Sequence, residues 1–408
     1  MSWFDRLLGR KDAQALTSLP DFLMMPSSKS GQQVNYATAL AVTTVLACCR
    51  VIAEGIAQVP CRLRKPKTGG GSVDATEHPL FRLLYRRPNF YQTAFEFWET
   101  LLFHLVLVGN AFVFISRVGG RVHELLIIEP GKVIVKRRDD LSLEYQITGE
   151  DGSLRYIPAS DIWHLRGPSW NSWMGMEAVK LAREAIGLSL ALEEAHARLH
   201  QNGIQPSGIY SVEGTLKPED HQKLVSWLKK SAAAANAGTP LVLDRAAKWM
   251  AQQMSGVDAQ HVETRRLQIE ENCRALRVMP IMVGAADKVA TYASSEQMFL
   301  AHVIHTLMPW GTRLEQSAEA NLLTDKEQAD GLFFKFYFQA LMRGDFKGRQ
   351  EGLQIMRRNG IINADEWRDL EDMNPRTDEG GAQYIVEANM ALQDGRDLPP
   401  PRPNITVS

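Results

Sequence analysis

The sequence lacks the loops and clusters that enzymes acting on nucleotides need. It has no Gly-x-x-x-x-Gly-Lys-Ser/Thr phosphate-binding loop, and the pair Gly131-Lys132 is followed by Val133, which has no hydroxyl to hold magnesium. It also lacks the clustered Asp and Glu residues that hold catalytic metal ions. We therefore expect no catalytic residues, no metal and no cofactor in this chain.

Two histidines are the strongest candidates for metal ligands, because His196 and His200 lie four residues apart near Glu193. A zinc site needs a third ligand close by, and a zinc protease places its catalytic Glu between the two histidines, which is not the case here. A metal site and a solvated or interfacial helix face both stay open, and the second is favoured.

Cysteines and long apolar runs are scarce. The sequence has four cysteines, Cys48, Cys49, Cys61 and Cys273. Their spacing does not fit a metal site, so we expect four structural free thiols in a reducing compartment. The longest apolar stretch, residues 101–115, is too short to cross a bilayer, and residues 1–10 are charged and do not resemble a secretory signal. These features predict a cytoplasmic protein without membrane contact.

An excess of charge of either sign is also missing. Lys and Arg total 46 against 47 Asp and Glu, which gives a formal net charge of −1. Tight binding of duplex DNA usually depends on a basic excess that neutralises phosphates, so the whole molecule is not an electrostatic DNA binder. With 408 residues and 45% apolar side chains, the chain is long enough for two or more ordinary globular cores.

What the sequence does have, across residues 172–295, is two long helical segments around a compact α/β insert. The first segment carries an apolar stripe with steps of three and four residues, at Met174, Ala178, Leu181, Ala185, Leu188, Leu192, Ala195 and Leu199. A second apolar line, through Val179, Ala182 and Ile186, flanks this stripe, so the helix needs neighbours on two sides. We expect Asn171-Ser172 to cap this helix, which would span about 40 Å.

The second helical segment ends before Pro280 and mixes both signs of charge. Its arginines are Arg265, Arg266, Arg274 and Arg277. They alternate with glutamates, which favours intersubunit or intrahelical ion pairs over a track for DNA, although the track stays open.

Other periodic stretches predict a mostly helical α+β chain. Helices are expected at 39–56, 78–85 and 94–108, and a long helix at 296–323 is expected to kink at Pro309. Short strands with a period of two are expected at 112–116, 122–128, 133–136, 145–148, 155–157 and 162–165, as in a small β barrel or sandwich. In the insert, strands are expected at 209–212 and 240–243 and a helix at 217–235.

Short phrases along the chain resemble the portal proteins of tailed phages, in the family named after phage HK97. The phrases, in colinear order, are Val51-Ile52-Ala53-Glu54 with Val59-Pro60, His78-Pro79-Leu80, Arg87-Pro88-Asn89, Phe95-Glu96-Phe97-Trp98-Glu99, Gly109-Asn110-Ala111, Asp161-Ile162-Trp163-His164-Leu165-Arg166-Gly167, Ala182-Arg183-Glu184-Ala185-Ile186-Gly187-Leu188, Asn202-Gly203 with Pro206-Ser207-Gly208, Arg343-Gly344-Asp345 and Asn359-Gly360. No single phrase is specific, but their order over about three hundred residues is.

The resemblance implies a portal fold with a wing, a stem, a clip and a crown. The expected parts are a flexible arm (1–35), a wing with a β subdomain (36–172), a first stem helix (173–202), an α/β clip (203–256), a second stem helix (257–278), a tunnel loop (279–295), a long wing helix with a return strand (296–337), a helical crown (338–394) and a disordered tail (395–408).

The resemblance also implies a function by geometry. Portal subunits form a ring, with twelve copies in this family, at one capsid vertex, where double-stranded DNA passes during packaging and ejection without being read in sequence. The implied partners are other copies of the chain, the terminase large subunit, a head-completion adaptor, and the major capsid and scaffold proteins. The chain would be made in the host cytoplasm and end in the virion.

Candidate residues follow for three surfaces. The stem interface between subunits would use Leu181, Ala185, Leu188, Leu192, Leu199, Arg265 and Arg266. The channel-facing loop would use Gly284, Asp287, Lys288 and Thr291, where a single lysine among small residues would touch phosphates weakly. The partner-binding face of the clip would use Lys223, Trp227, Lys229 and Lys230, although Trp227 could equally belong to the clip core.

Two rivals remain from other classes. One is a different ring-forming structural or secretion component, and the other is a DNA-processing enzyme, which the missing motifs argue against.

Overall fold

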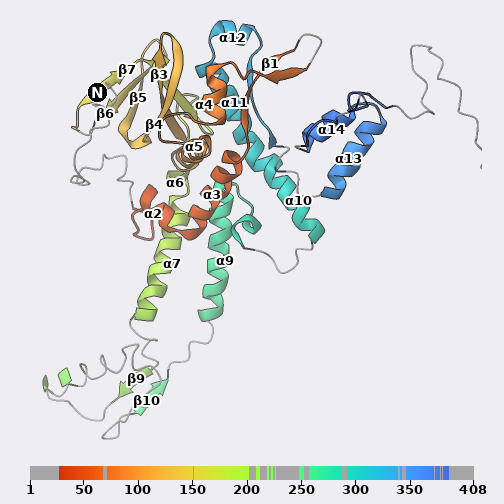
Figure 1. Cartoon of the computed structure of the whole chain (residues 1–408). Coiled ribbons are helices and arrows are strands. Elements are labelled where there is room, and N and C mark those ends of the chain that lie inside the picture. The colour runs from red at the N-terminus through yellow and green to blue at the C-terminus, as the bar shows by residue number, and fades with distance from the viewer. Residues whose placement is uncertain are drawn as a thin grey trace, which may run out of the picture. The chain divides into compact units, whose positions relative to one another are not determined.

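The computed structural model describes residues 27–67, 71–149, 151–201, 208–211, 218–219, 222–223, 226, 248–251, 257–285, 292–338, 341, 346–371, 373–376, 378 and 380–385. The chain divides into two compact units, Met1–Tyr337 and Phe338–Ser408, which are described separately (Figure 1).

The first unit is built on a helical core. Helix α5 (Ala94–Val108) starts at a capping box between Thr93 and Glu96 and ends at Gly109, which has a φ of 75°. It packs against α3 (Thr43–Ala57), and Phe97, Trp98, Leu101 and Leu102 on it are fully buried. The predicted helix at 94–108 is confirmed.

The predicted single helix at 39–56 is two helices. Helix α2 (Tyr36–Ala41) starts at Asn35, whose side chain forms a capping box with Thr38, and Val42 separates it from α3 with an extended backbone. Helix α4 (Pro79–Tyr85) starts at His78, which caps it, and so agrees with the prediction at 78–85.

Three antiparallel sheets complete this body. Strands β1 (Cys61–Pro66), β2 (Ser72–Asp74) and β11 (Phe333–Phe336) form a sheet in the order β11-β1-β2. Strands β3 (Asn110–Val118), β4 (Arg121–Ile128) and β8 (Ile162–Arg166) form a second, ordered β4-β3-β8. Strands β5 (Val133–Arg137), β6 (Leu143–Thr148) and β7 (Leu154–Ile157) form the third.

The second and third sheets enclose one apolar core. Its members are Phe112, Phe114, Leu126, Ile128, Tyr145, Ile147, Ile157 and Ile162. The predicted strands at 112–165 are therefore present. They belong to two separate sheets around a shared core, as in a sandwich, with short 3-10 turns η2 (Pro130–Lys132) and η3 (Ala159–Asp161) between them.

The two predicted stem helices run side by side as α7 (Arg183–Gln201) and α9 (Val257–Leu276) (Figure 1). The expected cap at Asn171-Ser172 is wrong. The helical run starts only at α6 (Ala178–Leu181), and a non-helical Ala182 separates α6 from α7. The Asn171 side chain instead accepts hydrogen bonds from the backbone of Trp173 and Met174, which holds a loop.

Several helical elements follow the stem. They are the 3-10 turn η5 (Pro280–Val283), helix α10 (Tyr292–His302), a π-helical turn (Val303–Leu307), helix α11 (Met308–Leu322) and helix α12 (Asp325–Ala329). Pro309 is the second residue of α11. The kink expected there is the widened π-helical turn directly before α11. Proline has no N–H to donate to the carbonyl four residues earlier, so the turn before it is free to widen.

Only part of the clip lies within the described residues. Strand β9 (Gly208–Ser211) agrees with the strand expected at 209–212 and pairs antiparallel with β10 (Lys248–Ala251), which the sequence did not predict. The strand expected at 240–243 lies outside the described residues, as does most of the helix expected at 217–235.

The second unit contains the two short helices α13 (Phe346–Arg358) and α14 (Ala364–Leu370). Asn363 and Glu366 form a capping box at α14, and Arg349 on α13 forms an ion pair with Glu371 at 2.6 Å. The short crown helices expected in this region are present. Within the part of the chain that the structure describes, no helix is long and apolar enough to cross a membrane.

Candidate subunit interface and channel residues

The inner face of the stem is a polar seam between α7 and α9. The Asn272 side chain donates to Ser189 Oγ at 3.0 Å, and the Ser189 hydroxyl lies 3.4 Å from Gln268 Oε1. Val179 and Ile186 are buried near this seam, and Arg265 pairs with Glu193 across it at 3.6 Å. The second apolar line of the sequence is therefore covered within the subunit.

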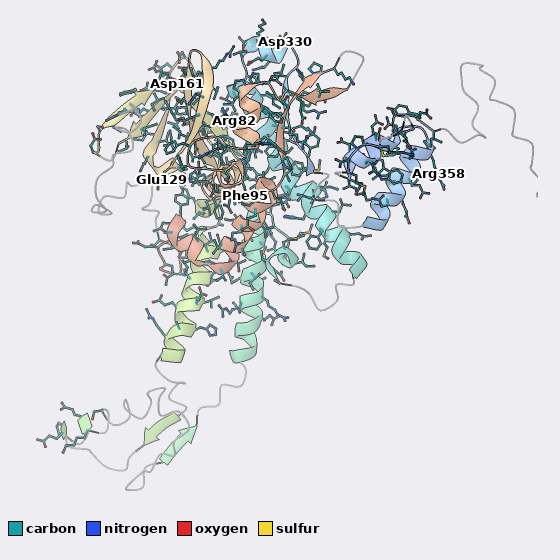
Figure 2. The ribbon with its side chains drawn as sticks, viewed as in Figure 1. Arg82, Phe95, Glu129, Asp161, Asp330 and Arg358 are labelled. Atoms are coloured by element: carbon teal, nitrogen blue, oxygen red, sulfur yellow. The ribbon has the colours of Figure 1, made fainter. Side chains whose placement is uncertain are left out.

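The outer face of the stem carries the first apolar stripe, and two leucines of this stripe are exposed. Leu181 is 71% exposed and Leu188 is 39% exposed, while Ala185 and Leu192 are half-buried. The side chain of Leu199 lies outside the described residues. Figure 2 shows side chains of α7 and α9 standing out from both rods, in contrast to the crowded wing. An isolated subunit thus exposes two of the leucines that the sequence assigned to an intersubunit face, Leu181 and Leu188.

The two arginines assigned to that face have different surroundings. Arg265 is occupied by its ion pair with Glu193 in the same chain, and Arg266 is exposed. Arg274 pairs with Glu270 and Glu271 on its own helix. The predicted intrahelical ion pairs are confirmed for Arg274.

The end of the expected flexible arm is ordered against α7, so residues 27–35 correct that expectation. Ser28 is buried, and a Cβ added at Gly187 would meet Ser28 Oγ at 2.2 Å. The Lys29 N–H donates to Glu184 at 2.9 Å, which lowers the pKa of Glu184, and the Gln32 side chain donates to Glu194 at 2.6 Å. Residues 1–26 lie outside the described residues.

A network of close backbone contacts and side-chain hydrogen bonds joins the stem to the wing. A Cβ at Gly175 would lie 1.8 Å from the Gly109 carbonyl oxygen, so only glycine fits there. Asn110 Oδ1 accepts from the Gly175 N–H at 2.8 Å, and Asn110 Nδ2 donates to the carbonyls of Val108 and Gly175 at 3.2 Å each. The Gly109-Asn110 phrase of the sequence is thus a structural joint.

His164 completes this joint from β8. Burial, followed by the nearby Arg166, lowers the pKa of His164 to about 3, so its ring is neutral. The neutral ring donates from Nε2 to Asn110 Oδ1 at 3.1 Å and accepts at Nδ1 from the Tyr145 hydroxyl at 3.2 Å. The loop that the joint holds presents Trp170, which is 92% exposed. Nothing in the sequence pattern singled out Trp170.

A pocket of about 560 Å³ lies where wing, stem and α11 meet. Its lining is mostly apolar and includes three arginines. The lining includes Ile52, Leu105, Leu181, Trp310, Arg274, Arg277 and Arg313. Burial lowers the pKa of Arg313, whose guanidinium donates to the Gly167 carbonyl at 3.1 Å. Because Leu181 belongs to both, the pocket continues the exposed stripe.

The candidate loop and clip residues lie mostly outside the described residues. Gly284 follows η5 with a φ of 81° and open space around it. Lys223 is exposed. Asp287, Lys288, Thr291, Trp227, Lys229 and Lys230 lie outside the described residues.

The histidine and cysteine predictions can be compared with the described residues. Among the described residues, no group of three or more His, Cys, Asp and Glu side chains could hold a metal ion. All four cysteines are free and buried, as expected, and the sulfurs of Cys48 on α3 and Cys273 on α9 lie 3.7 Å apart.

Comparison with known proteins gives consistent matches over most of the chain. The sequence model of the family described as phage portal protein matches residues 43–372. A protein named "Probable portal protein" from Streptomyces phage phiC31 is 27% identical over 96% of this chain and 89% of its own length. The "Portal protein" of Enterobacteria phage HK97 is 26% identical over 84% of this chain and 81% of its own length.

Solved structures share the fold. A chain of the virion of a native gene transfer agent particle superposes with a TM-score of 0.60, at 22% identity over 84% of this chain and 94% of that one. A chain from the neck of the native particle, computed with C12 symmetry, gives 0.57, at 23% identity over 83% of this chain and 92% of that one. An HK97-family phage portal protein from Corynebacterium diphtheriae gives 0.55, at 17% identity over 76% and 96%.

Proposed function

Because the chain belongs to the phage portal protein family, we propose that it is one subunit of a closed ring that forms the DNA channel at one vertex of a phage-like capsid. The observation that carries this proposal is the family match across residues 43–372, over both stem helices. The uncovered stripe of Leu181 and Leu188 supports it, because a helix with a buried face and an exposed leucine face needs a neighbour.

A ring of twelve is the expected assembly. The structure of the neck of the native gene transfer agent particle, which contains a similar chain, was computed with C12 symmetry. Heterologous contacts between identical subunits close into a ring when the rotation from one subunit to the next divides a full turn evenly. Mass photometry of the purified protein should therefore show a species near 550 kDa, about twelve copies of the 45.7 kDa chain, and micrographs should show a central hole. A 45.7 kDa monomer that persists at high concentration would overturn the proposal.

We propose that each subunit has the parts of the family fold, with the boundaries expected from the sequence. Residues 36–172 would form the wing, 173–202 and 257–278 the stem, 203–256 the clip, 279–295 the tunnel loop, 296–337 the long helix and return strand, and 338–394 the crown. Residues 1–35 would be the arm, ordered from 27 onward, and 395–408 the tail.

The stem interface would join Leu181, Ala185, Leu188, Leu192 and Leu199 of one subunit to the next. Small residues on the rods would let the helices approach closely, and Arg266, which is exposed, is free to pair across the interface. Arg265 is occupied within its own subunit and contributes by holding the two rods together.

The tunnel loop would lie in the channel. Its small residues around Gly284, Asp287, Lys288 and Thr291 offer little apolar area for packing, and weak phosphate contacts would let DNA slide in both directions. The net charge of −1 suits a channel that does not grip its cargo.

The clip would be the docking surface for the terminase large subunit and then for a head-completion adaptor, through Lys223, Trp227, Lys229 and Lys230. Exchanging the three lysines for Glu should weaken capture of a purified terminase while rings stay intact by mass photometry. If capture is unchanged, the docking surface lies elsewhere. The wing would contact the capsid and scaffold proteins.

The protein would act without catalysis or cofactor, first in the host cytoplasm and then in the virion. An assay for magnesium-dependent nuclease and ATPase activity on purified rings tests this point. Turnover that co-purifies with the ring would contradict it.

A further inference from the structure

Within the first unit, helix α10 carries a run of exposed apolar side chains. All four residues from Gln297 to Leu300 are exposed, although three of them are apolar. Phe299 is 57% exposed. The sequence of α10 contains one acidic residue, Glu296, and no lysine or arginine. A helix with this composition on the surface of a soluble subunit marks an interaction site.

The exposed apolar line continues through the π turn. Ile304 is 44% exposed, and Ile304 and Met308 line a hollow of about 720 Å³ on one side of the helix. Trp310 of the same helix lines the separate pocket of about 560 Å³ at the junction of wing and stem. The continuous helix from α10 to α11 therefore exposes apolar side chains on one side and lines the pocket of about 560 Å³ on another.

The pocket and the stripe that continues from it leave apolar side chains exposed, which a docked segment would cover. The pocket has a mostly apolar lining that includes Leu181, and the stripe continues from Leu181 to Leu188. Arg277 also lines the pocket. An occupant should therefore be apolar, rod-shaped and weakly acidic, which is the chemistry of α10.

Helix α10 of the same subunit cannot be this occupant. Because α10 continues α11 through the π turn, and α11 itself lines the pocket, α10 cannot fold back onto the pocket of its own subunit without breaking the helix. In a ring, each subunit needs two different surfaces, one for each neighbour. The exposed side chains from Leu300 to Met308 and the stripe from Leu181 to Leu188 each span about 10–12 Å at 1.5 Å per residue.

We infer that α10 of each subunit docks into the pocket and leucine stripe of its neighbour, so that Phe299, Leu300 and Ile304 cover Leu181 and Leu188. This inference rests on the proposed ring and adds the pair of surfaces that meet in it.

Cysteine cross-linking tests the pairing directly. The double variant Leu188→Cys/Ile304→Cys, treated as assembled rings with a short bismaleimide, should give a ladder of covalent multimers on a denaturing gel. Each single variant should give monomers, because one introduced thiol cannot link two subunits in a heterologous contact. The native cysteines are buried and should not react.

A matched control keeps the outcome specific. In Leu188→Cys/Leu154→Cys, the second thiol lies at an equally exposed apolar position on β7, and we expect no ladder. Rings without a ladder in Leu188→Cys/Ile304→Cys would overturn the inference and leave the portal function standing. A ladder of equal strength in the control would also overturn it. Absence of rings in the wild type would instead remove the portal function itself.

A second variant tests the docking of α10 without cross-linking. Phe299→Asp should reduce the ring population at least tenfold by mass photometry, while the melting temperature of the monomer stays unchanged, because the side chain is exposed in the subunit. Leu154→Asp serves as the matched control. Undiminished rings in Phe299→Asp would count against docking of α10.

Discussion

The wing and the stem treat their large apolar side chains in opposite ways. In the wing, Trp98 and Trp163 meet edge to face at 6.2 Å, and both are buried almost completely. In the stem, leucines at positions 181 and 188 face outward, while serine, glutamine and asparagine lie between the rods. The subunit buries the large apolar side chains of the wing by itself, and it leaves two leucines of the stem exposed.

This contrast separates the residues that determine the fold from those that determine assembly. Burial of an aromatic core stabilises the isolated chain, so its loss should appear in unfolding experiments. Exposed leucines contribute little to the isolated chain, so their loss should appear only when subunits associate. Each of the following changes tests one side of that division.

Leu188→Asp should have the largest effect, because it should abolish rings altogether. The aspartate is tolerated in the monomer, where the position is partly exposed, but ring closure would bury its charge without a partner. Mass photometry should show only monomers, with an unchanged circular dichroism spectrum. Rings of normal abundance would place the interface away from the stem stripe.

Trp163→Ala should destabilise the wing strongly. The indole is fully buried, donates to Ser317 Oγ at 2.9 Å and packs against Trp98, so its removal leaves a large cavity. We expect a loss of about 3–5 kcal/mol in the free energy of unfolding. Urea titration of the variant in a Leu188→Asp background measures this without interference from rings. A loss below about 1 kcal/mol would mean that the wing core is less tightly packed than the structure indicates.

Acid should weaken the wing through its buried histidines. The pKa is lowered by burial to about 3 at His164 and to about 4 at His104. Above about pH 6.5 both are neutral in the folded and unfolded chain; below it the unfolded chain gains protons that the folded wing does not accept. Stability should therefore fall as pH falls from about 6.5 toward 3, by up to about 1.4 kcal/mol per pH unit for each histidine.

Urea titrations between pH 7.5 and pH 5 measure this slope. His164→Gln should lower stability at neutral pH and make the dependence on pH shallower, since one of the two groups no longer titrates. An unchanged slope would mean that His164 is not held neutral in the folded wing.

Changes in the tunnel loop should have the smallest effect on either fold or assembly. Replacing Asp287, Lys288 and Thr291 by Ser keeps the length of the loop, so rings and unfolding should match the wild type. The effect should appear in packaged genome length and retention in assembled heads, and Lys288→Ala alone should be milder, because one exposed lysine makes a weak, salt-screened phosphate contact. Normal packaging and retention in the triple variant would contradict a channel-facing role.

How far the sequence predicts this structure depends on the range of the interactions. Helix α5 was predicted to the residue because its end is a local signal, the glycine at 109. The start of the stem helix was missed because a close backbone approach between residues 109 and 175 delays it, and no local pattern signals such a contact. Strand β10 was missed because pairing with β9, rather than its own composition, defines it.

The candidate sites show the same limit. The period of the stem stripe was readable from the sequence, but the sequence alone did not tell which of its two apolar lines the subunit covers by itself. Exposure of the apolar side chains of α10 and of Trp170 was not predicted either, because it depends on which other elements pack nearby and not on local sequence. The channel and clip residues stay predictions, apart from the exposure of Lys223.

The joint at Asn110 has a consequence for the order of folding. One side chain satisfies a backbone group next to it at Val108 and two distant groups, the Gly175 N–H and the ring of His164. The two distant bonds can form only when β3 and β8 have come together, so closing the loop that leads into the stem is a contact of long sequence separation and should be slow. The wing would then reach its native state first, and the stem would present its leucines to other subunits only once the wing is complete.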